Sequence, residues 1–113
     1  MPFDWDEGKN RINQKKHGVS FETAVLVFDD PYALTQKDIS HDREERLVTL
    51  GAVGPGSILF VVHVNYEQAA QEEVIRIISA RPATSHERKS YEEAYRTTEA
   101  RNRRHRRKKG RGD

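Results

Sequence analysis

The sequence contains no cysteine and no long hydrophobic run. Without cysteine there can be no disulfide, no thiolate zinc site and no cysteine nucleophile. No uninterrupted apolar run exceeds the length of Ile58–Val62, which is too short to span a bilayer. The chain begins M-P-F-D-W-D-E, which lacks the basic and then apolar order of a secretory signal. We therefore expect a cytoplasmic protein without a membrane segment, whose 113 residues fit one domain with one modest core.

Charge is unevenly divided along the chain. Residues 1–95 carry 11 Lys and Arg against 16 Asp and Glu, whereas residues 96–113 carry 9 against 2. This divides the chain into a domain at 1–95 and a basic extension at 96–113. From Arg101 the extension has no apolar residue to pack, so we expect the last helix to end here and disorder to follow. Its positive field favours phosphate groups without sequence preference, but a solubilising extension without a partner is an equally good interpretation.

Capping residues and apolar spacing predict three helices. A helix over residues 7–17 follows the capping residue Asp6 and ends at a glycine. A second helix begins after Ser20, ends before D-D-P, and turns four apolar residues to one side: Phe21, Ala24, Val25 and Phe28. A third helix begins at the capping box formed by Thr84 and Glu87. Two helices thus precede the strands and one follows them.

Three segments rich in β-branched residues, 46–53, 58–65 and 74–80, predict strands joined by the turns G-P-G-S and Y-E-Q-A-A-Q-E-E. A weaker strand is expected at 33–36. The expected fold is therefore α+β, with a small antiparallel meander of three to four strands packed by two N-terminal helices and a C-terminal helix.

The expected register of these strands predicts a cluster of polar side chains. Tight hairpins place His63 opposite both Val48 and Arg76, and leave Phe60 and Val62 on the face that the helices cover. Four polar side chains then gather at one end of the other face: Arg46, His63, Asn65 and Arg76. Such a cluster is an anion site, and phosphate is the natural ligand for the fork of an arginine. The alternative is a surface network in which these arginines pair with nearby glutamates and contribute little.

Several separated blocks resemble the BrnT toxin family, over residues 3 to about 95. In the order of the family, they are F-D-W-D-E-G-K-N-R-I-N-Q-K-K-H-G-V-S-F-E-T-A, V-F-D-D-P, E-E-R-L-V-T-L-G and R-I-I-S-A-R-P-A-T-S-H-E-R-K-S-Y-E. The resemblance implies a bacterial type II toxin with a RelE-like fold, which cleaves RNA without a metal or cofactor and inhibits translation and growth. It also implies a partner, the ribbon-helix-helix antitoxin BrnA, which neutralises the toxin. The pair then binds operator DNA through the antitoxin in a higher-order complex.

Cleavage of RNA by its own 2′-hydroxyl needs a proton acceptor, a proton donor and cations that stabilise the phosphorane-like transition state. The candidates are Arg46, Arg76 and Arg81 for the charge, and His63 and His17 for proton transfer. His17 also suits a structural role at the end of the first helix. Eight residues are candidates for RNA binding: Lys16, Glu45, Asn65, Tyr91, Arg103, Arg104, Arg106 and Arg107.

Some of these interpretations stay open. Glu45 suits a base or an ion-pair partner, and Tyr91 suits base stacking or the core. The five histidines lack the spacing of a metal site, so no metal is expected. Pro82 departs from the usual basic residue of the family. An alternative hypothesis is thus a non-catalytic member that acts as an antitoxin-binding corepressor or a nucleic-acid-binding module.

Overall fold

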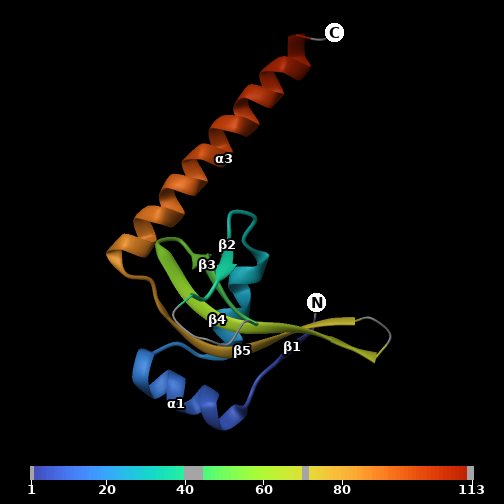
Figure 1. The fold of residues 1–113 in the computed structure, drawn as a ribbon. Coiled ribbons are helices and arrows are strands. Elements are labelled where there is room, and N and C mark those ends of the chain that lie inside the picture. Colours follow the sequence, from blue (N-terminus) through green and yellow to red (C-terminus); the bar gives the residue numbers. More distant parts are fainter. Residues whose placement is uncertain (1, 40–44, 70–71, 112–113) are drawn as a thin grey trace.

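A mixed five-stranded sheet forms the centre of the computed structural model, which describes residues 2–39, 45–69 and 72–111, with side chains up to Arg103. The elements are β1 (Phe3–Asp4), α1 (Glu7–His17), α2 (Phe21–Ala24), the 3-10 helix η1 (Val25–Asp29), β2 (Leu34–Lys37), β3 (Arg46–Gly54), β4 (Ser57–Gln68), β5 (Glu72–Pro82) and α3 (Ser85–Arg111) (Figure 1). The strand order is β1-β5-β4-β3-β2.

The α+β class and the antiparallel β3-β4-β5 meander are confirmed, but the expected strand number is wrong. The fifth strand is β1, which pairs parallel with β5, whereas the other strand pairs are antiparallel. With only two residues, β1 is too short to show an alternating pattern in the sequence. Parts of two predicted loops, residues 40–44 and 70–71, lie outside the described residues.

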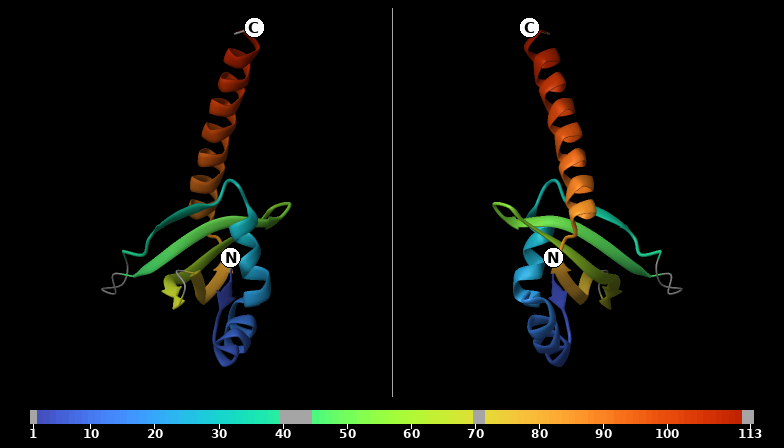
Figure 2. Two further views of the ribbon diagram at one scale, coloured as in Figure 1. Left: turned by 90° about the vertical axis from the view of Figure 1, so that its right-hand side faces the viewer. Right: turned by 90° about the vertical axis from the view of Figure 1, so that its left-hand side faces the viewer.

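Helices α1 and α2 with η1 cover one side of the sheet, and α3 rises from the other side (Figure 2). The core between these helices and the sheet contains buried Phe21, Ala24 and Val27 against Val61 and Ile77. The predicted second helix changes after Ala24 into a 3-10 helix. Because a 3-10 helix has three residues per turn, the fully buried residues recur at every third position, Val27 among them, while Val25 and Phe28 are partly buried and pack against the same core.

Helix α1 begins and ends as predicted. The Asp6 side chain accepts a hydrogen bond from the Lys9 amide at 2.9 Å, and Gly18 closes the helix with φ 71°. A buried asparagine then ties the helix to the sheet. The Asn13 Nδ2 donates to the carbonyls of Val19 and Ala80 at 2.8 Å each, and the Ala80 amide donates to Asn13 Oδ1 at 3.1 Å.

The strand register differs from the prediction at two irregularities. Leu47 lies opposite His63 and Val48 opposite Val62, with an irregularity between Ala52 and Gly54. A second irregularity at Val62 and His63 places His63 opposite Ile77, and not opposite Arg76. The assignment of the faces is therefore also wrong. The helices cover the side of β4 that carries Leu59, Val61 and His63, and the side that carries Phe60 and Val62 faces away from them.

Helix α3 begins at the predicted capping box, in which the Glu87 amide donates to Thr84 Oγ1 at 3.2 Å and the Thr84 amide to Glu87 Oε1 at 2.8 Å. It extends away from the sheet and continues to Arg111 (Figure 1). Disorder was predicted from Arg101 onward because that part of the chain has no apolar residue. Arginine and lysine are nonetheless good helix formers. No helix in the described part of the chain is long and apolar enough to cross a membrane.

The foot of α3 is held by polar contacts to the end of η1. Tyr91 is buried, and its hydroxyl donates to Asp30 Oδ2 at 2.5 Å. Burial raises the pKa of Asp30, but hydrogen bonds from the Ala52 amide and from Tyr91 outweigh it and keep that pKa below its usual range. Burial and the same carboxylate raise the pKa of Tyr91. The ring of Tyr95 lies 4.3 Å from that of Tyr32 between centroids, so the helix leaves the sheet at a fixed point.

Candidate functional site

The side of the sheet that faces away from α1 and η1 carries three rows of paired side chains. One row runs Leu34–Leu50–Phe60–Arg81 across β2, β3, β4 and β5, the next runs Gln36–Val48–Val62–Ser79, and the last runs Arg46–Val64–Arg76. Residues directly opposite each other in neighbouring strands project to the same side. We call these eleven residues the open face.

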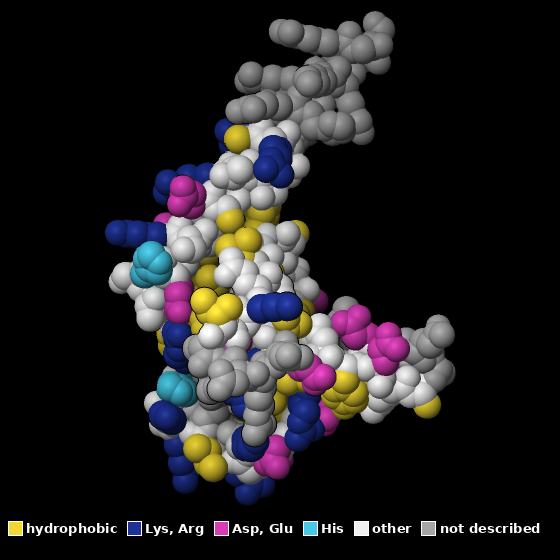
Figure 3. Space-filling view, viewed as in Figure 1, with side chains coloured by type: hydrophobic (Ala, Val, Ile, Leu, Met, Phe, Trp, Pro, Cys, Tyr) yellow, Lys and Arg dark blue, Asp and Glu magenta, His cyan; other side chains and the backbone are white. Residues whose placement is uncertain are grey.

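Three adjoining cavities lie along the β2 side of the open face, where it meets α3. We call these three cavities together the groove. Their volumes are about 460, 270 and 480 Å³. Gln36 lines all three, and Val48 and Phe60 line the first two. Figure 3 shows hydrophobic side chains exposed between the foot of α3 and the sheet, with Lys and Arg side chains over α1 and along α3. The groove thus combines an apolar floor with nearby positive charge.

Besides Arg101 in the cavity along α3, Arg81 is the arginine that lines the groove. Its guanidinium lies over the Phe60 ring, 3.9 Å from the ring centroid, and donates two hydrogen bonds to Glu87, at 2.8 and 2.9 Å. The hydrogen bonds raise the pKa of Arg81 and lower the pKa of Glu87, so both groups stay charged at neutral pH. Arg81 is therefore a planar cation on an aromatic support, with one carboxylate as its present partner.

The two other predicted arginines lie on the same face, in the row beyond Val62. Arg46 and Arg76 are both opposite Val64, so their backbones are two strand spacings apart, roughly 10 Å. Arg76 Nη1 lies 2.5 Å from Asp4 Oδ2, which also accepts from the Tyr66 hydroxyl at 3.1 Å. The hydrogen bond from Arg76 is the main cause that lowers the pKa of Asp4. The structure thus brings Arg46, Arg76 and Arg81 to one face but not to one point.

His63 is not part of this face, contrary to the predicted cluster. It is 1% exposed, and its ring lies between Thr49 Oγ1 and Asn65 Oδ1, each at 2.7 Å. The Phe28 ring meets it edge to face at 5.0 Å between centroids. Burial lowers the pKa of His63, although the hydrogen bond to Asn65 opposes this. Both ring nitrogens are occupied inside the protein, which is the environment of a structural histidine.

The remaining predicted residues are dispersed. His17 ends α1 and Lys16 precedes it, on the helix layer behind the sheet. Glu45 is exposed directly before β3. Tyr91 belongs to the core, with its hydroxyl on Asp30, so of its two predicted uses the structure favours the packing one. Arg103 is exposed on α3, and the side chains of three further residues lie outside the described part: Arg104, Arg106 and Arg107.

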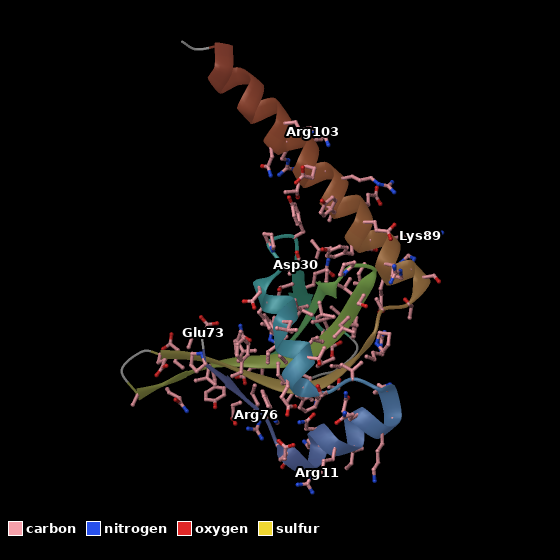
Figure 4. All side chains as sticks on the ribbon, turned by 180° about the vertical axis from the view of Figure 1, so that it is seen from behind. Arg11, Asp30, Glu73, Arg76, Lys89 and Arg103 are labelled. Atoms are coloured by element: carbon pink, nitrogen blue, oxygen red, sulfur yellow. The ribbon has the colours of Figure 1, made fainter. Side chains whose placement is uncertain are left out.

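Figure 4 shows how far apart the charged groups lie. Arg76 is near the N-terminal strand and Arg11 is on α1, whereas Lys89 and Arg103 follow α3 away from the sheet. Among residues 2–39, 45–69 and 72–103, no group of three or more His, Asp or Glu side chains is placed to hold a metal ion. The groove itself has a mixed charged lining, in which three cations lie beside three carboxylates: Lys37, Arg81 and Arg101 with Asp38, Glu87 and Glu93.

Among the residues of the groove that were not candidates from the sequence are Gln36, Phe60 and His86. Phe60 was assigned to the covered face because of the register error, and Gln36 belongs to the weak strand whose place in the sheet was uncertain. His86 was visible one position before Glu87 of the capping box. A helix that begins four residues after Arg81 has its first turn near that arginine, and this proximity is the signal that could have indicated His86.

Comparison with known proteins agrees with the resemblance. A family model described as the ribonuclease toxin BrnT of type II toxin-antitoxin systems matches residues 5–87. The crystal structure of the Brucella abortus ribonuclease toxin BrnT is similar to the chain, with 24% sequence identity and a TM-score of 0.57. The match covers 75% of this chain and 99% of that one, which supports a common fold. No curated protein sequence matches the chain.

Proposed function

The chain belongs to the BrnT family of ribonuclease toxins of type II toxin-antitoxin systems, and we propose that it is a metal-independent endoribonuclease that binds its substrate along the open face and the groove. The observation that carries this proposal is the position of Arg81. Its guanidinium lines the groove, is stacked on Phe60, and carries the charge and planar fork that suit a phosphate. Growth inhibition in the bacterial cytoplasm follows if the RNA that is cut is needed for translation.

The reaction that fits these residues uses the RNA as its own nucleophile. The 2′-oxygen forms a bond to the adjacent phosphorus, the bond from phosphorus to the 5′-oxygen breaks, and a 2′,3′-cyclic phosphate and a 5′-hydroxyl result. The 2′-hydroxyl loses one proton and the leaving 5′-oxygen gains one. In this proposal the fork of Arg81 exchanges Glu87 for the non-bridging oxygens, where negative charge accumulates in the transition state, while its plane stays over the Phe60 ring.

His86 is the imidazole placed to take part in proton transfer. Of the histidines whose side chains are described, His86 lines the groove, His63 is buried with both ring nitrogens bonded, and His17 ends α1 behind the sheet. An imidazole has a pKa suited to accepting and giving protons near neutral pH. We assign one of the two proton transfers to His86 and the other to solvent, in place of the roles first predicted for His63 and His17.

The arginines outside the groove bind the rest of the RNA chain in this proposal. Arg46 and Arg76 lie one row further along the open face, where the phosphates next to the scissile one would pass. The basic residues from Arg96 onward, most of them on α3, extend the positive field away from the sheet. Such contacts are electrostatic. Their removal would therefore weaken affinity for all RNA sequences alike, and the affinity that they provide would depend on salt.

The experiment that tests the proposal combines growth and cleavage. Induced expression of the wild type should arrest growth, and the purified protein should cleave RNA in the presence of EDTA. Arg81→Ala should lower kcat/KM by about 100-fold, because a transition-state cation contributes this much in other enzymes. Arg81→Lys should recover only part of the loss, since it lacks the fork. The matched control is Arg11→Ala on α1, which should cleave normally. Absence of cleavage by the wild type, or an unchanged rate in Arg81→Ala, would contradict the proposal.

A second candidate function is a non-catalytic binding role, in which the protein only holds its antitoxin and acts as a corepressor. The observation that favours it is that Arg76 and Arg81 each have a carboxylate partner, Asp4 and Glu87. Family membership implies an antitoxin, and we propose one of the BrnA type with a ribbon-helix-helix fold, in a complex that reaches operator DNA through it. Co-purification with the neighbouring gene product, with neither growth arrest nor RNA cleavage by the free protein, would support this role.

A further inference from the structure

The middle of the groove has the chemistry of a site for one nucleobase. Its floor is apolar, formed by Val48, Phe60 and Val62. Its rim carries the Arg81 guanidinium and the Gln36 amide, followed on the same side by Lys37, Asp38 and Ile39. The cavity on the Arg81 side has a volume of about 460 Å³, within the range of pockets that hold small ligands. A groove with an apolar floor and polar groups at its rim offers stacking and edge recognition at the same place.

The stacking partner is preformed. Unpaired bases in protein–RNA complexes stack on aromatic rings or on the plane of an arginine. Here Arg81 lies 3.9 Å from the centroid of the Phe60 ring, so one layer of such a stack already exists. Glu87 holds the guanidinium by two hydrogen bonds, which fixes its orientation before a base arrives.

The group that could read the base edge is Gln36. It is exposed on β2, lines each of the three cavities, and its side chain makes no hydrogen bond to a described residue. A carboxamide offers a donor and an acceptor side by side, a pair that matches adenine with two hydrogen bonds. No lysine or arginine side chain can offer this combination.

We propose that the groove binds one unpaired nucleotide of RNA, whose base stacks on the Arg81–Phe60 pair and is read by the amide of Gln36, with adenine as the preferred base. This inference rests on the proposed ribonuclease function, and it deepens that function by naming single-stranded RNA as the substrate class. A base in a duplex cannot reach the floor without leaving its stack, so paired RNA is a poor ligand.

Binding can be measured separately from cleavage. The full chain is titrated into fluorescent single-stranded oligonucleotides with 2′-fluoro sugars, which lack the attacking hydroxyl, in four sequences that differ at one central base. We expect the oligonucleotide with central adenine to bind about tenfold more tightly than the others, and the matching duplex to bind at least tenfold more weakly. In Gln36→Ala the four affinities should agree within about threefold, since a two-hydrogen-bond contact supplies a preference of this size.

Two further variants separate stacking from reading. Phe60→Leu keeps the floor apolar but removes the ring, so affinity should fall by about tenfold for every base while the order of preference remains. Gln14→Ala removes an exposed glutamine of α1, outside the groove, and should change nothing. Thermal unfolding of each variant shows that it is folded.

Each outcome decides between the two proposals. Equal affinity for all bases in the wild type, an unchanged preference in Gln36→Ala, tight duplex binding or no binding at all would overturn the nucleotide site. Base-selective binding that Gln36→Ala abolishes, together with no cleavage of ordinary RNA, would support the site and overturn the proposed ribonuclease activity. Cleavage without base preference would do the reverse.

Discussion

The two faces of the same sheet use polar residues in opposite ways. Thr49 and His63 are buried on the covered face, as are Asn10 and Asn13 of the helix α1 packed on it, and among the described residues no buried side-chain nitrogen or oxygen lacks a partner. On the open face, Arg76 and Arg81 each pair with one carboxylate of their own, and Gln36 lines the groove. Polar groups that are fully satisfied inside the fold stabilise it, whereas polar groups with spare bonding capacity at a cavity are available to a ligand. Substitutions on the two faces should therefore separate stability from binding.

The largest effect should come from the covered face, in Asn13→Ala. The asparagine side chain satisfies the carbonyls of Val19 and Ala80 and the amide of Ala80. Its removal leaves three buried backbone groups without partners, so the free energy of unfolding should fall by about 3 kcal/mol. Urea unfolding measures the change, with Gln14→Ala on the exposed side of α1 as the control. A loss below about 1 kcal/mol would mean that water replaces the amide, and that the covered face is less closed than the structure indicates.

A somewhat smaller effect is expected from Gly51→Ala, also on the covered face. A Cβ at this position would lie 2.8 Å from Val27 Cβ and 3.0 Å from the Val27 carbonyl oxygen, so η1 would have to move away from β3. Overpacking of this kind should lower the free energy of unfolding by about 2 kcal/mol. Gly54→Ala at the end of the same strand is the matched control, because its added Cβ meets nothing within 4 Å. Equal stability of the two variants would show that η1 is not tightly packed on β3.

The third effect tests His63 through pH. Because burial lowers the pKa of His63 below 6.5, the unfolded chain takes up a proton at a higher pH than the folded chain does. The free energy of unfolding should therefore fall as the pH drops below about 6.5. His63→Gln should lower stability at pH 7 by about 1 kcal/mol, through the lost hydrogen bonds, and should make the decline between pH 6.5 and 5 shallower. Gln14→Ala, which removes no titratable group, should keep the full decline. The free energy of unfolding is measured by denaturant titration over this pH range. The same decline in His63→Gln as in the wild type would contradict a buried, neutral ring.

Local chemistry made much of the fold predictable, and register limited the rest. The cap at Asp6, the left-handed Gly18 and the capping box of Thr84 and Glu87 are short-range features, and all three are confirmed. The faces of β4 were assigned wrongly because I-L-F-V-V is apolar at every position, so alternation cannot distinguish its two sides.

Two irregularities that no local signal announces then moved His63 away from the arginines. Arg46 and Arg76 were nevertheless expected on one face, and they do share it. Gln36 and Phe60 entered the groove only through long-range pairing of β2, β3, β4 and β5. The sequence can thus indicate which residues belong to a site, but the position of the site on the sheet depends on how the strands pair.

The smallest effect on stability should come from Glu87→Gln on the open face, where the expected change is in RNA affinity. Glutamine can keep the capping box with Thr84, so the free energy of unfolding should change by less than about 1 kcal/mol. Arg81 would lose its charged partner and meet a phosphate without first leaving a carboxylate, so affinity for single-stranded RNA should rise by about threefold. The logarithm of affinity should also fall more steeply with salt, by about 0.7 for one added phosphate contact. Glu92→Gln removes the same charge from α3 without touching Arg81, so an equal rise in that variant would assign the effect to net charge alone, and the open face would then lose its distinction from the rest of the surface.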